Sequence, residues 1–361
     1  MMNREEQLAF LKELTEAKGI SGDEKEVSRV MKKYLEGYAD ELDYDNLGSL
    51  IALKRGSQDV KVMLSGHIDE VGFIVSYIEE DGFLRISPVG GWWAHVLPSQ
   101  KVSVKTLDGN VYMGVIGSIP PHGMKPEVRS KVMDIKDLYV DLGVSNKKEV
   151  LDLGINVGDS VIPYTEFMVM NNPEYLCSKA FDDWIGAAVV VEVMRNLKDK
   201  KIKSSLYSVG SVQEEVGLRG ARTSTYKVKP DVAIAIDVSM SYDVPGSSKG
   251  ESKLGKGVAL SLMDSSVIAH RGLFKMLRDI CNEKNIPFTY DSLVAGGTDS
   301  GEINKSFDGV INMTLSLPCR YFHSHNSVIN LKDYNACVDL LTEFVSRLDK
   351  DMLEELKNYK K

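Results

Sequence analysis

Cysteine is scarce in this sequence, and its few cysteines lie far apart. The 361 residues contain four of them, Cys177, Cys281, Cys319 and Cys337, and none forms a paired motif with another. Scattered cysteines are typical of free thiols in a reducing compartment, whereas disulfide frameworks and thiolate zinc sites need paired spacings. Any metal that the chain binds is therefore expected to be held by histidine, aspartate and glutamate.

Long hydrophobic runs and an excess of positive charge are also absent. Apolar stretches such as 185–193 are far shorter than a bilayer span, and the residues from Met1 to Glu6 are charged rather than signal-like. The 44 basic and 52 acidic side chains give a net charge of −8, which argues against nucleic acid as the main partner. We expect a cytoplasmic protein with no membrane partner, long enough for two domains.

Helix and strand patterns alternate at both ends of the chain. Asn3 is a candidate cap for an amphipathic helix over about 4–18. Ser21 and Glu24 predict a capping box for a second helix over about 23–38. Further helices are predicted over about 183–198, over about 265–284 and after Leu331, with strands near 206–212 and 232–237. This alternation is typical of an α/β domain with a largely parallel sheet.

The middle of the chain shows a different pattern. From Val71 to about Tyr164 no convincing helix is predicted, and β-branched runs are broken by turn signals such as Asp81-Gly82 and Asp108-Gly109. This pattern is typical of a small antiparallel barrel. We therefore predict one α/β domain, 1–70 plus 166–361, interrupted by a β-rich insert, 71–165.

Three predicted strands end in residues that can bind metals. The first ends in His67-x-Asp69, the second in Glu214-Glu215 and the third in Asp237. Ligands of an open α/β sheet gather beyond the carboxyl ends of the strands, so these side chains are expected to meet there. Together with Asp182-Asp183 and His323, they offer the oxygen and nitrogen ligands of a two-metal hydrolytic centre. The pattern favours a metallo-aminopeptidase.

Each of these residues also has a simpler explanation. His67 could be a buried histidine satisfied by a carboxylate, rather than a ligand whose other ring N–H is accepted by Asp69. Asp182 could cap the helix that follows it, and Asp237 could begin a loop. Surface exposure of the glutamate pair is disfavoured because an apolar strand precedes it.

The two glutamates are expected to have different roles, because one can bind metal while the other acts as a general base. Either His323 or His325 could be the ligand in its segment. His95, His122 and His270 lack a carboxylate at metal-site spacing and are expected to be structural or surface residues.

As a set, these motifs closely resemble the tetrahedral (TET) co-catalytic metallo-aminopeptidases, a family that includes glutamyl aminopeptidases, deblocking aminopeptidases and a protein once labelled endoglucanase M. The motifs are His67-x-Asp69, Asp182-Asp183, Glu214-Glu215, Asp237, the segment 320–324 around His323, and Gly296-Gly-Thr-Asp-Ser-Gly301. The resemblance covers essentially the full chain. It implies a phosphorylase/hydrolase-like α/β catalytic domain with a central mixed sheet, interrupted by a small β-barrel dimerisation domain.

The resemblance also implies roles for individual residues. His67, Asp182 and Asp237 would hold one metal ion, and Asp182, Glu215 and His323 would hold the other. Asp69 would orient His67, Glu214 would be the general base for a metal-activated water, and the bond between Asp182 and Asp183 would be cis. Zinc or cobalt is expected, and manganese is also compatible with these ligands. One departure follows His323-Ser324, where the family often has proline and this chain has His325-Asn326 instead, which leaves the local loop shape and specificity open.

For assembly, the resemblance implies subunits paired into dimers by the insert, and a tetrahedral dodecamer acting on short peptides. Trp92, Trp93 and Val96 could form such an interface or fill the core of the insert. The alternative functions are a carbohydrate hydrolase with paired carboxylates, and a non-catalytic metal-dependent scaffold. The first leaves His67, Asp237 and His323 without a role, and the second leaves Glu214 without one.

Overall fold

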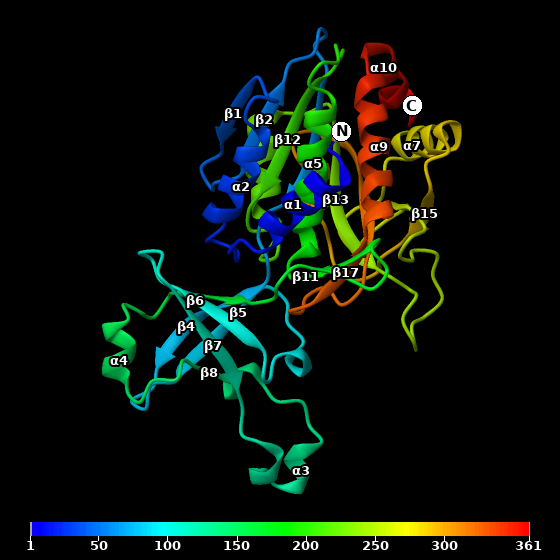
Figure 1. Ribbon diagram of the computed structural model, residues 1–361. Helices are drawn as coiled ribbons and strands as arrows, with labels where there is room; N and C mark the ends of the chain where they lie inside the picture. Colours follow the sequence, from blue (N-terminus) through cyan, green and yellow to red (C-terminus); the bar gives the residue numbers. More distant parts are fainter. Residues whose placement is uncertain (1, 361) are drawn as a thin grey trace.

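An eight-stranded sheet lies at the centre of the computed structural model, which describes residues 2–360 (Figure 1). Its order is β1 (Glu41–Tyr44), β2 (Leu50–Lys54), β12 (Ser205–Ser211), β3 (Lys61–His67), β13 (Val232–Met240), β16 (Ile311–Cys319), β14 (Val258–Ser261) and β15 (Phe288–Asp291). The four strands from β12 to β16 run parallel, whereas the pairs β1–β2, β2–β12 and β16–β14 are antiparallel. The mixed α/β fold is therefore confirmed, with parallel pairing at its centre.

Helices cover both faces of this sheet, and the alternation of side chains along the strands separates the two cores. In β3, Val62 and Leu64 belong to the larger core, and Met63 between them belongs to the smaller one. The larger core includes residues of α1 (Arg4–Thr15), α2 (Lys25–Leu35), α5 (Phe181–Asn196), α7 (Arg271–Lys284), α9 (Leu331–Arg347) and α10 (Lys350–Asn358). The smaller core includes residues of α6 (Arg219–Val228) and α8 (Ser300–Asn304). Burial on both faces explains why these strands carry apolar side chains on both faces, as the run from Val232 to Ile236 in β13 does.

The beginnings of α1 and α2 illustrate a correct and a wrong prediction. Asn3 caps α1 and forms a capping box with Glu6. The predicted capping box of Ser21 and Glu24 is wrong, because the Ser21 hydroxyl donates to Asp69 Oδ2 at 2.6 Å and Glu24 accepts from the main-chain N–H of Gly22. Ser21 thus connects the N-terminal segment to the end of β3.

Two predicted helices near the C-terminus also have different bounds. Helix α7 begins at Arg271 rather than near Ser265, because Asp264 accepts main-chain N–H groups of Ser266 and Val267 and holds that segment in a turn. The single helix predicted after Leu331 is two helices, α9 and α10, because Asp349 caps the second one.

The middle of the chain forms a closed barrel of antiparallel strand pairs, at one end of the molecule in Figure 1. The strands in order are β4 (Gly72–Ile78), β5 (Leu84–Val89), β8 (Tyr139–Asp141), β7 (Val111–Gly117), β6 (Lys101–Lys105) and β9 (Ser160–Pro163). Short helices interrupt the barrel segment: α3 (Pro126–Arg129), on an arm that extends from the barrel, α4 (Lys147–Asp152), and the 3₁₀ turns η1 (Ala94–Val96), η2 (Pro121–Gly123) and η3 (Ile135–Asp137). The boundaries at residues 71 and 165 remain a prediction.

A small three-stranded sheet lies after the barrel in the chain. Its order is β10 (Met168–Val169), β11 (Tyr175–Ser178) and β17 (Ser327–Asn330). Strand β11 leads into α5, and β17 follows the segment that carries His323. This sheet therefore holds two site-bearing segments of the chain side by side.

The proposed apolar patch of the insert divides between core and surface. Trp92 and Val96 pack against the hydrophobic core of the barrel, whereas Trp93 is 63% exposed. The four cysteines are free and buried. Across residues 2–360, none of the helices combines the length and apolar character that crossing a membrane requires.

Candidate metal centre

The predicted site residues meet at the carboxyl ends of the parallel strands. His67 ends β3, Asp237 lies in β13, and the turn after β12 carries Glu214. Helix α5 packs directly on β3 because Gly66 has no side chain, and a Cβ atom there would lie 2.4 Å from the main chain of Ala187. This close approach brings the beginning of α5, with Asp182, to the end of β3.

Asp182 lies between two histidines that are far apart in the sequence. Its Oδ1 is 3.2 Å from His67 Nε2, and its Oδ2 is 3.2 Å from His323 Nε2. One carboxylate therefore directs one oxygen toward each imidazole. This is the arrangement that a bridging ligand of two cations requires. The peptide bond between Asp182 and Asp183 is cis.

Two groups of potential metal ligands share Asp182. On what we call the His67 side, His67, Asp182 and Asp237 offer ligand atoms that all lie within 4.8 Å of one another. On the His323 side, Asp182, Glu215 and His323 do the same. Glu214 belongs to neither group, and its Oε2 is 3.9 Å from His67 Nε2.

Main-chain carbonyl groups orient both imidazoles. His67 Nδ1 is 3.0 Å from the carbonyl oxygen of Asp69, and His323 Nδ1 is 2.8 Å from that of Gly91. The Asp69 carboxylate is farther from His67 Nδ1, at 3.5 Å. It accepts the main-chain N–H groups of Glu214 and Glu215 at 2.9 and 3.1 Å. Asp69 thus holds the glutamate turn beside β3, a role that the sequence prediction missed.

The cluster contains more buried negative groups than positive ones. The carboxyl groups of Asp182, Glu214, Glu215 and Asp237 surround two imidazoles. Burial raises the pKa of Glu214 and Asp237 well above the usual range, and neighbouring carboxylates raise it further. Burial also acts to raise the pKa of Asp182, but hydrogen bonds from His323 and His67 outweigh it and lower that pKa.

Divalent cations fit this donor set. Glu215 Oε1 is buried and has no hydrogen-bond partner, while its Oε2 lies 3.3 Å from His323 Nε2. Nitrogen and oxygen donors of this kind suit zinc, cobalt or manganese, and cationic charge would stabilise the ionised carboxylates.

Two further buried aspartates, both within motifs named from the sequence but given no role there, support the cluster. Asp183 Oδ2 accepts the main-chain N–H of His67 at 3.1 Å. Asp299 Oδ2 accepts the hydroxyl groups of Ser65 at 2.7 Å and Ser211. The sequence signal for the second aspartate was the motif Gly296-Gly-Thr-Asp-Ser-Gly301, and the structure shows that its partners are serines of two adjacent parallel strands.

A buried ion pair lies next to the segments that carry His67 and Asp182. Lys179 Nζ donates to the Glu70 carboxylate and, at 2.8 Å, to the carbonyl oxygen of Ala17. It also lies 4.2 Å from the centre of the Trp184 ring. The pair joins the residue after Asp69 to the segment that leads into Asp182, so it stabilises the packing of the two segments that carry His67 and Asp182.

The other histidines lie outside both ligand groups. His325 is buried beside Trp92, with ring centroids 5.6 Å apart, and burial lowers its pKa to about 4. His270 caps α7 by accepting from the main-chain N–H of Leu273. His95 and His122 lie in the 3₁₀ turns of the insert.

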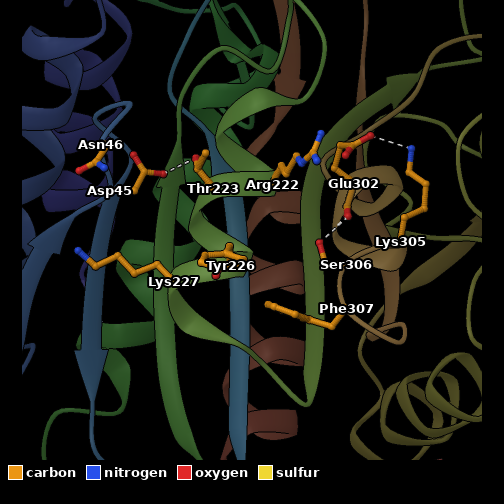
Figure 2. A pocket seen from close by; sticks show the side chains of 10 residues that line it. All are labelled: Asp45, Asn46, Arg222, Thr223, Tyr226, Lys227, Glu302, Lys305, Ser306 and Phe307. Atoms are coloured by element: carbon orange, nitrogen blue, oxygen red, sulfur yellow. Dashed lines mark hydrogen bonds and ion pairs between the residues drawn. The ribbon is translucent and has the colours of Figure 1, made fainter.

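A cavity of about 1100 Å³ lies away from the cluster, between α6 and α8 (Figure 2). The Tyr226 and Phe307 rings in its lining stack with centroids 5.8 Å apart. Two lining pairs satisfy each other, Thr223 with Asp45 and Lys305 with Glu302, as the dashed lines in Figure 2 show. None of the lining residues belongs to either ligand group, so we assign the cavity no part in the metal chemistry.

Comparisons with known proteins identify relatives over nearly the whole length. A family model described as M42 glutamyl aminopeptidase matches residues 48–340. The glutamyl aminopeptidase of Lactococcus lactis is 33% identical, over 97% of this chain and 98% of its own length. The structure of a TET aminopeptidase from a marine sediment Thaumarchaeota archaeon has a TM-score of 0.95 and 38% identity, covering 98% of this chain and 99% of that one. The TET1 peptidase of Pyrococcus horikoshii, which can assemble into a tetrahedron or a large octahedral shell, has a TM-score of 0.85 and 30% identity, covering 95% and 100%.

Proposed function

The chain belongs to the M42 glutamyl aminopeptidase family, and from this premise we propose that it removes N-terminal residues from short peptides at the cluster around Asp182. The family makes the protein a peptide hydrolase that depends on divalent metal ions. The observation that carries the site assignment is the Asp182 carboxylate, whose two oxygens each lie 3.2 Å from a different imidazole.

Two ions are proposed per chain, one on each side of Asp182. His67 and Asp237 would complete one set of ligands, and Glu215 and His323 would complete the other. When bound, such ions would acidify water and polarise a peptide carbonyl. Zinc or cobalt is proposed, with manganese as the third candidate. Elemental analysis, and activation of the metal-depleted protein by each ion in turn, test both the count and the identity.

Glu214 is proposed as the general base and acid. It lies beside the cluster without belonging to either ligand group, so its carboxylate is available for protons. Burial raises its pKa, which suits a group that takes a proton from water and returns it to the leaving amine. Asp69 would position Glu214 indirectly, because its carboxylate accepts the main-chain N–H groups of both glutamates.

A free α-amine is proposed as the feature that substrates share. The test is hydrolysis of a short peptide and of its N-acetyl form by the same metal-loaded sample. We expect the acetylated peptide to be a poor substrate. Equal rates for both would favour an endopeptidase or an acyl-removing enzyme, and cleavage of cellulose would favour the carbohydrate hydrolase.

A homo-oligomer, most simply a tetrahedral dodecamer of dimers, is proposed for assembly. Support comes from the Pyrococcus horikoshii relative and from exposed apolar side chains on the barrel, including Trp93 and, along β7, Val111, Met113 and Val115. Light scattering on the metal-loaded protein is expected to give a mass near twelve chains of 40.0 kDa each. A fully active monomer would contradict the proposal. A cytoplasmic location is proposed as well, in keeping with four free cysteines.

A further inference from the structure

The barrel supplies the hydrogen-bond acceptor of a proposed metal ligand. His323 Nδ1 lies 2.8 Å from the carbonyl oxygen of Gly91, which belongs to the loop between β5 and η1. A carbonyl oxygen can only accept, so Nδ1 carries the hydrogen. In the neutral ring this leaves the lone pair on Nε2, the atom that lies 3.2 Å from Asp182 and 3.3 Å from Glu215. The tautomer that can bind a metal therefore depends on a residue of the insert.

His323 has little support from its own segment. It follows β16 in a turn, with a φ of 54°, and its side chain is 35% exposed. His67 ends a central strand, and its side chain is 2% exposed. The neighbouring Phe322 ring lies edge-on to the His323 ring, with centroids 5.7 Å apart, but the hydrogen-bond partner of Nδ1 comes from outside the segment.

Trp92 anchors the loop that carries the Gly91 carbonyl. Its ring stacks on Phe73 of β4, with centroids 4.9 Å apart, and its Nε1 donates to the carbonyl oxygen of Gly72 at 3.0 Å. Its ring also lies beside that of His325, two residues after His323, with centroids 5.6 Å apart. Trp92 therefore links the barrel wall to the segment with the proposed ligand.

Two glycines allow the loop to come this close to the cluster. A Cβ atom on Gly91 would lie 3.2 Å from His323 Nδ1. A Cβ atom on Gly90 would lie 2.6 Å from Val71 and 3.4 Å from Glu215, and the φ of this glycine is 78°. The loop is thus shaped to approach both His323 and Glu215, the two residues that complete the His323 side.

We infer that Trp92 is a positioning residue for His323, and that through it the insert controls metal occupancy on the His323 side. By fixing the Gly91 carbonyl against Nδ1, it holds Nε2 toward Asp182 and Glu215. On the His67 side, the acceptor beside the imidazole is the carbonyl oxygen of Asp69, which does not belong to this loop. This inference rests on the ligand sets proposed above.

The test compares Trp92→Ala with Trp93→Ala in the full-length protein. The two residues are adjacent and of the same type, but Trp93 is 63% exposed. Each metal-depleted protein is titrated with zinc against a chromophoric chelator, and its oligomeric mass is measured in parallel. We expect Trp92→Ala to weaken only one of two zinc sites, by about 10- to 100-fold, as other outer-shell substitutions do. Trp93→Ala should leave both affinities unchanged.

Rescue by metal distinguishes positioning from a general structural role. If Trp92 only positions His323, saturating zinc restores kcat in Trp92→Ala, and only the zinc concentration needed for half activation rises. Should Trp92→Ala fail to fold, Trp92→Phe decides, because it keeps an aromatic ring that can stack on Phe73 and removes the Nε1–H donor together with part of the ring. A several-fold weakening of one zinc site is expected there.

The outcomes separate this inference from the proposed function. Two wild-type zinc affinities in a folded Trp92 variant would overturn the inference and leave the proposed function intact. Equal weakening of both sites would overturn it too, because the loop would then support the whole centre. Fewer than two zinc ions in the wild-type protein would overturn the proposed ligand sets themselves.

Discussion

The two sides of Asp182 are built from the same donor types but on different supports. On the His67 side, His67 and Asp237 lie on adjacent parallel strands that are buried on both faces. On the His323 side, Glu215 and His323 lie in turns, and His323 depends on a carbonyl group of the insert. A ligand on a packed strand is fixed by the core, whereas a ligand in a turn needs outside support to reach the same precision. The comparison predicts one rigid and one adjustable metal position around a shared carboxylate.

The largest expected effect comes from Glu214→Gln, which should slow catalysis without weakening metal binding on either side of Asp182. The amide keeps the size of the side chain but cannot act as the base, so kcat/KM should fall by about 10²–10⁴-fold while two ions remain bound. The neighbouring Glu215→Gln is the matched variant, and it should lose affinity on the His323 side. Near-normal activity of a fully loaded Glu214→Gln sample would show that another group takes the proton.

Next in size is the loss of the ion pair behind the His67 side. Lys179→Met leaves the buried Glu70 carboxylate without its cation, which should lower the free energy of unfolding by about 3–5 kcal/mol. Urea unfolding of the metal-free protein measures this loss. The double variant Lys179→Met/Glu70→Gln should recover most of the stability, because no unpaired charge remains.

Lys148 provides a surface control for that prediction. It pairs with Asp152 at 2.6 Å but is largely exposed, so Lys148→Met should leave the unfolding midpoint unchanged. If Lys179→Met also left the free energy of unfolding unchanged, the buried ion pair would not stabilise the His67 side, and that side would lose its claim to be the more rigid one.

The histidine substitutions break the comparison one side at a time. His323→Ala should reduce the ion content from two to one, because the ligand group of His67, Asp182 and Asp237 stays complete. His67→Ala should also leave one ion, but it should in addition destabilise the fold, since it empties a buried position at the end of β3. Elemental analysis and thermal unfolding of both variants check this. Two retained ions in His323→Ala would show an error in the ligand set.

The smallest expected effect is a difference in the order of metal release. A chelator should remove the ion on the His323 side first, because the partly exposed His323 ring can turn away more easily than the buried His67 ring. Stopped-flow release from the wild-type protein should show two phases, with rates differing on the order of tenfold. The slow phase should be the one that survives in His323→Ala, and a single phase in the wild type would remove the distinction between the sides.

The sequence was informative where a local pattern or a general rule of sheet topology determines the structure. Apolar strand patterns and the rule that sites form at the carboxyl ends of parallel strands brought His67, Glu214 and Asp237 together in the prediction. Asn3 was predicted as a cap from the amphipathic pattern that follows it, and the structure confirms the cap. The family was recognised from the complete set of motifs and is confirmed by the comparisons. The ligand assignment itself remains a prediction.

The features that the sequence did not predict depend on distant partners. The Ser21 hydroxyl was expected to cap a helix and instead reaches Asp69, which lies in another segment. The acceptor for His323 is the main-chain carbonyl of Gly91, and since every residue has such a carbonyl, the sequence does not reveal which one is used. Trp92 and Trp93 could not be told apart as core or interface residues from the sequence, and only the closed barrel shows that Trp92 packs against its core while Trp93 is exposed. Such relations appear when segments pack, not in local patterns.

The order of segments along the chain has a consequence for synthesis. Strand β3, which ends in His67, is made early, but both of its neighbours, β12 and β13, lie beyond residue 204. The barrel strands lie within residues 72–163 and can close while the partners of β3 are still unmade. The cluster around Asp182 can form only after residue 323 has left the ribosome. A nascent chain therefore lacks the complete cluster until residues up to His323 have been made.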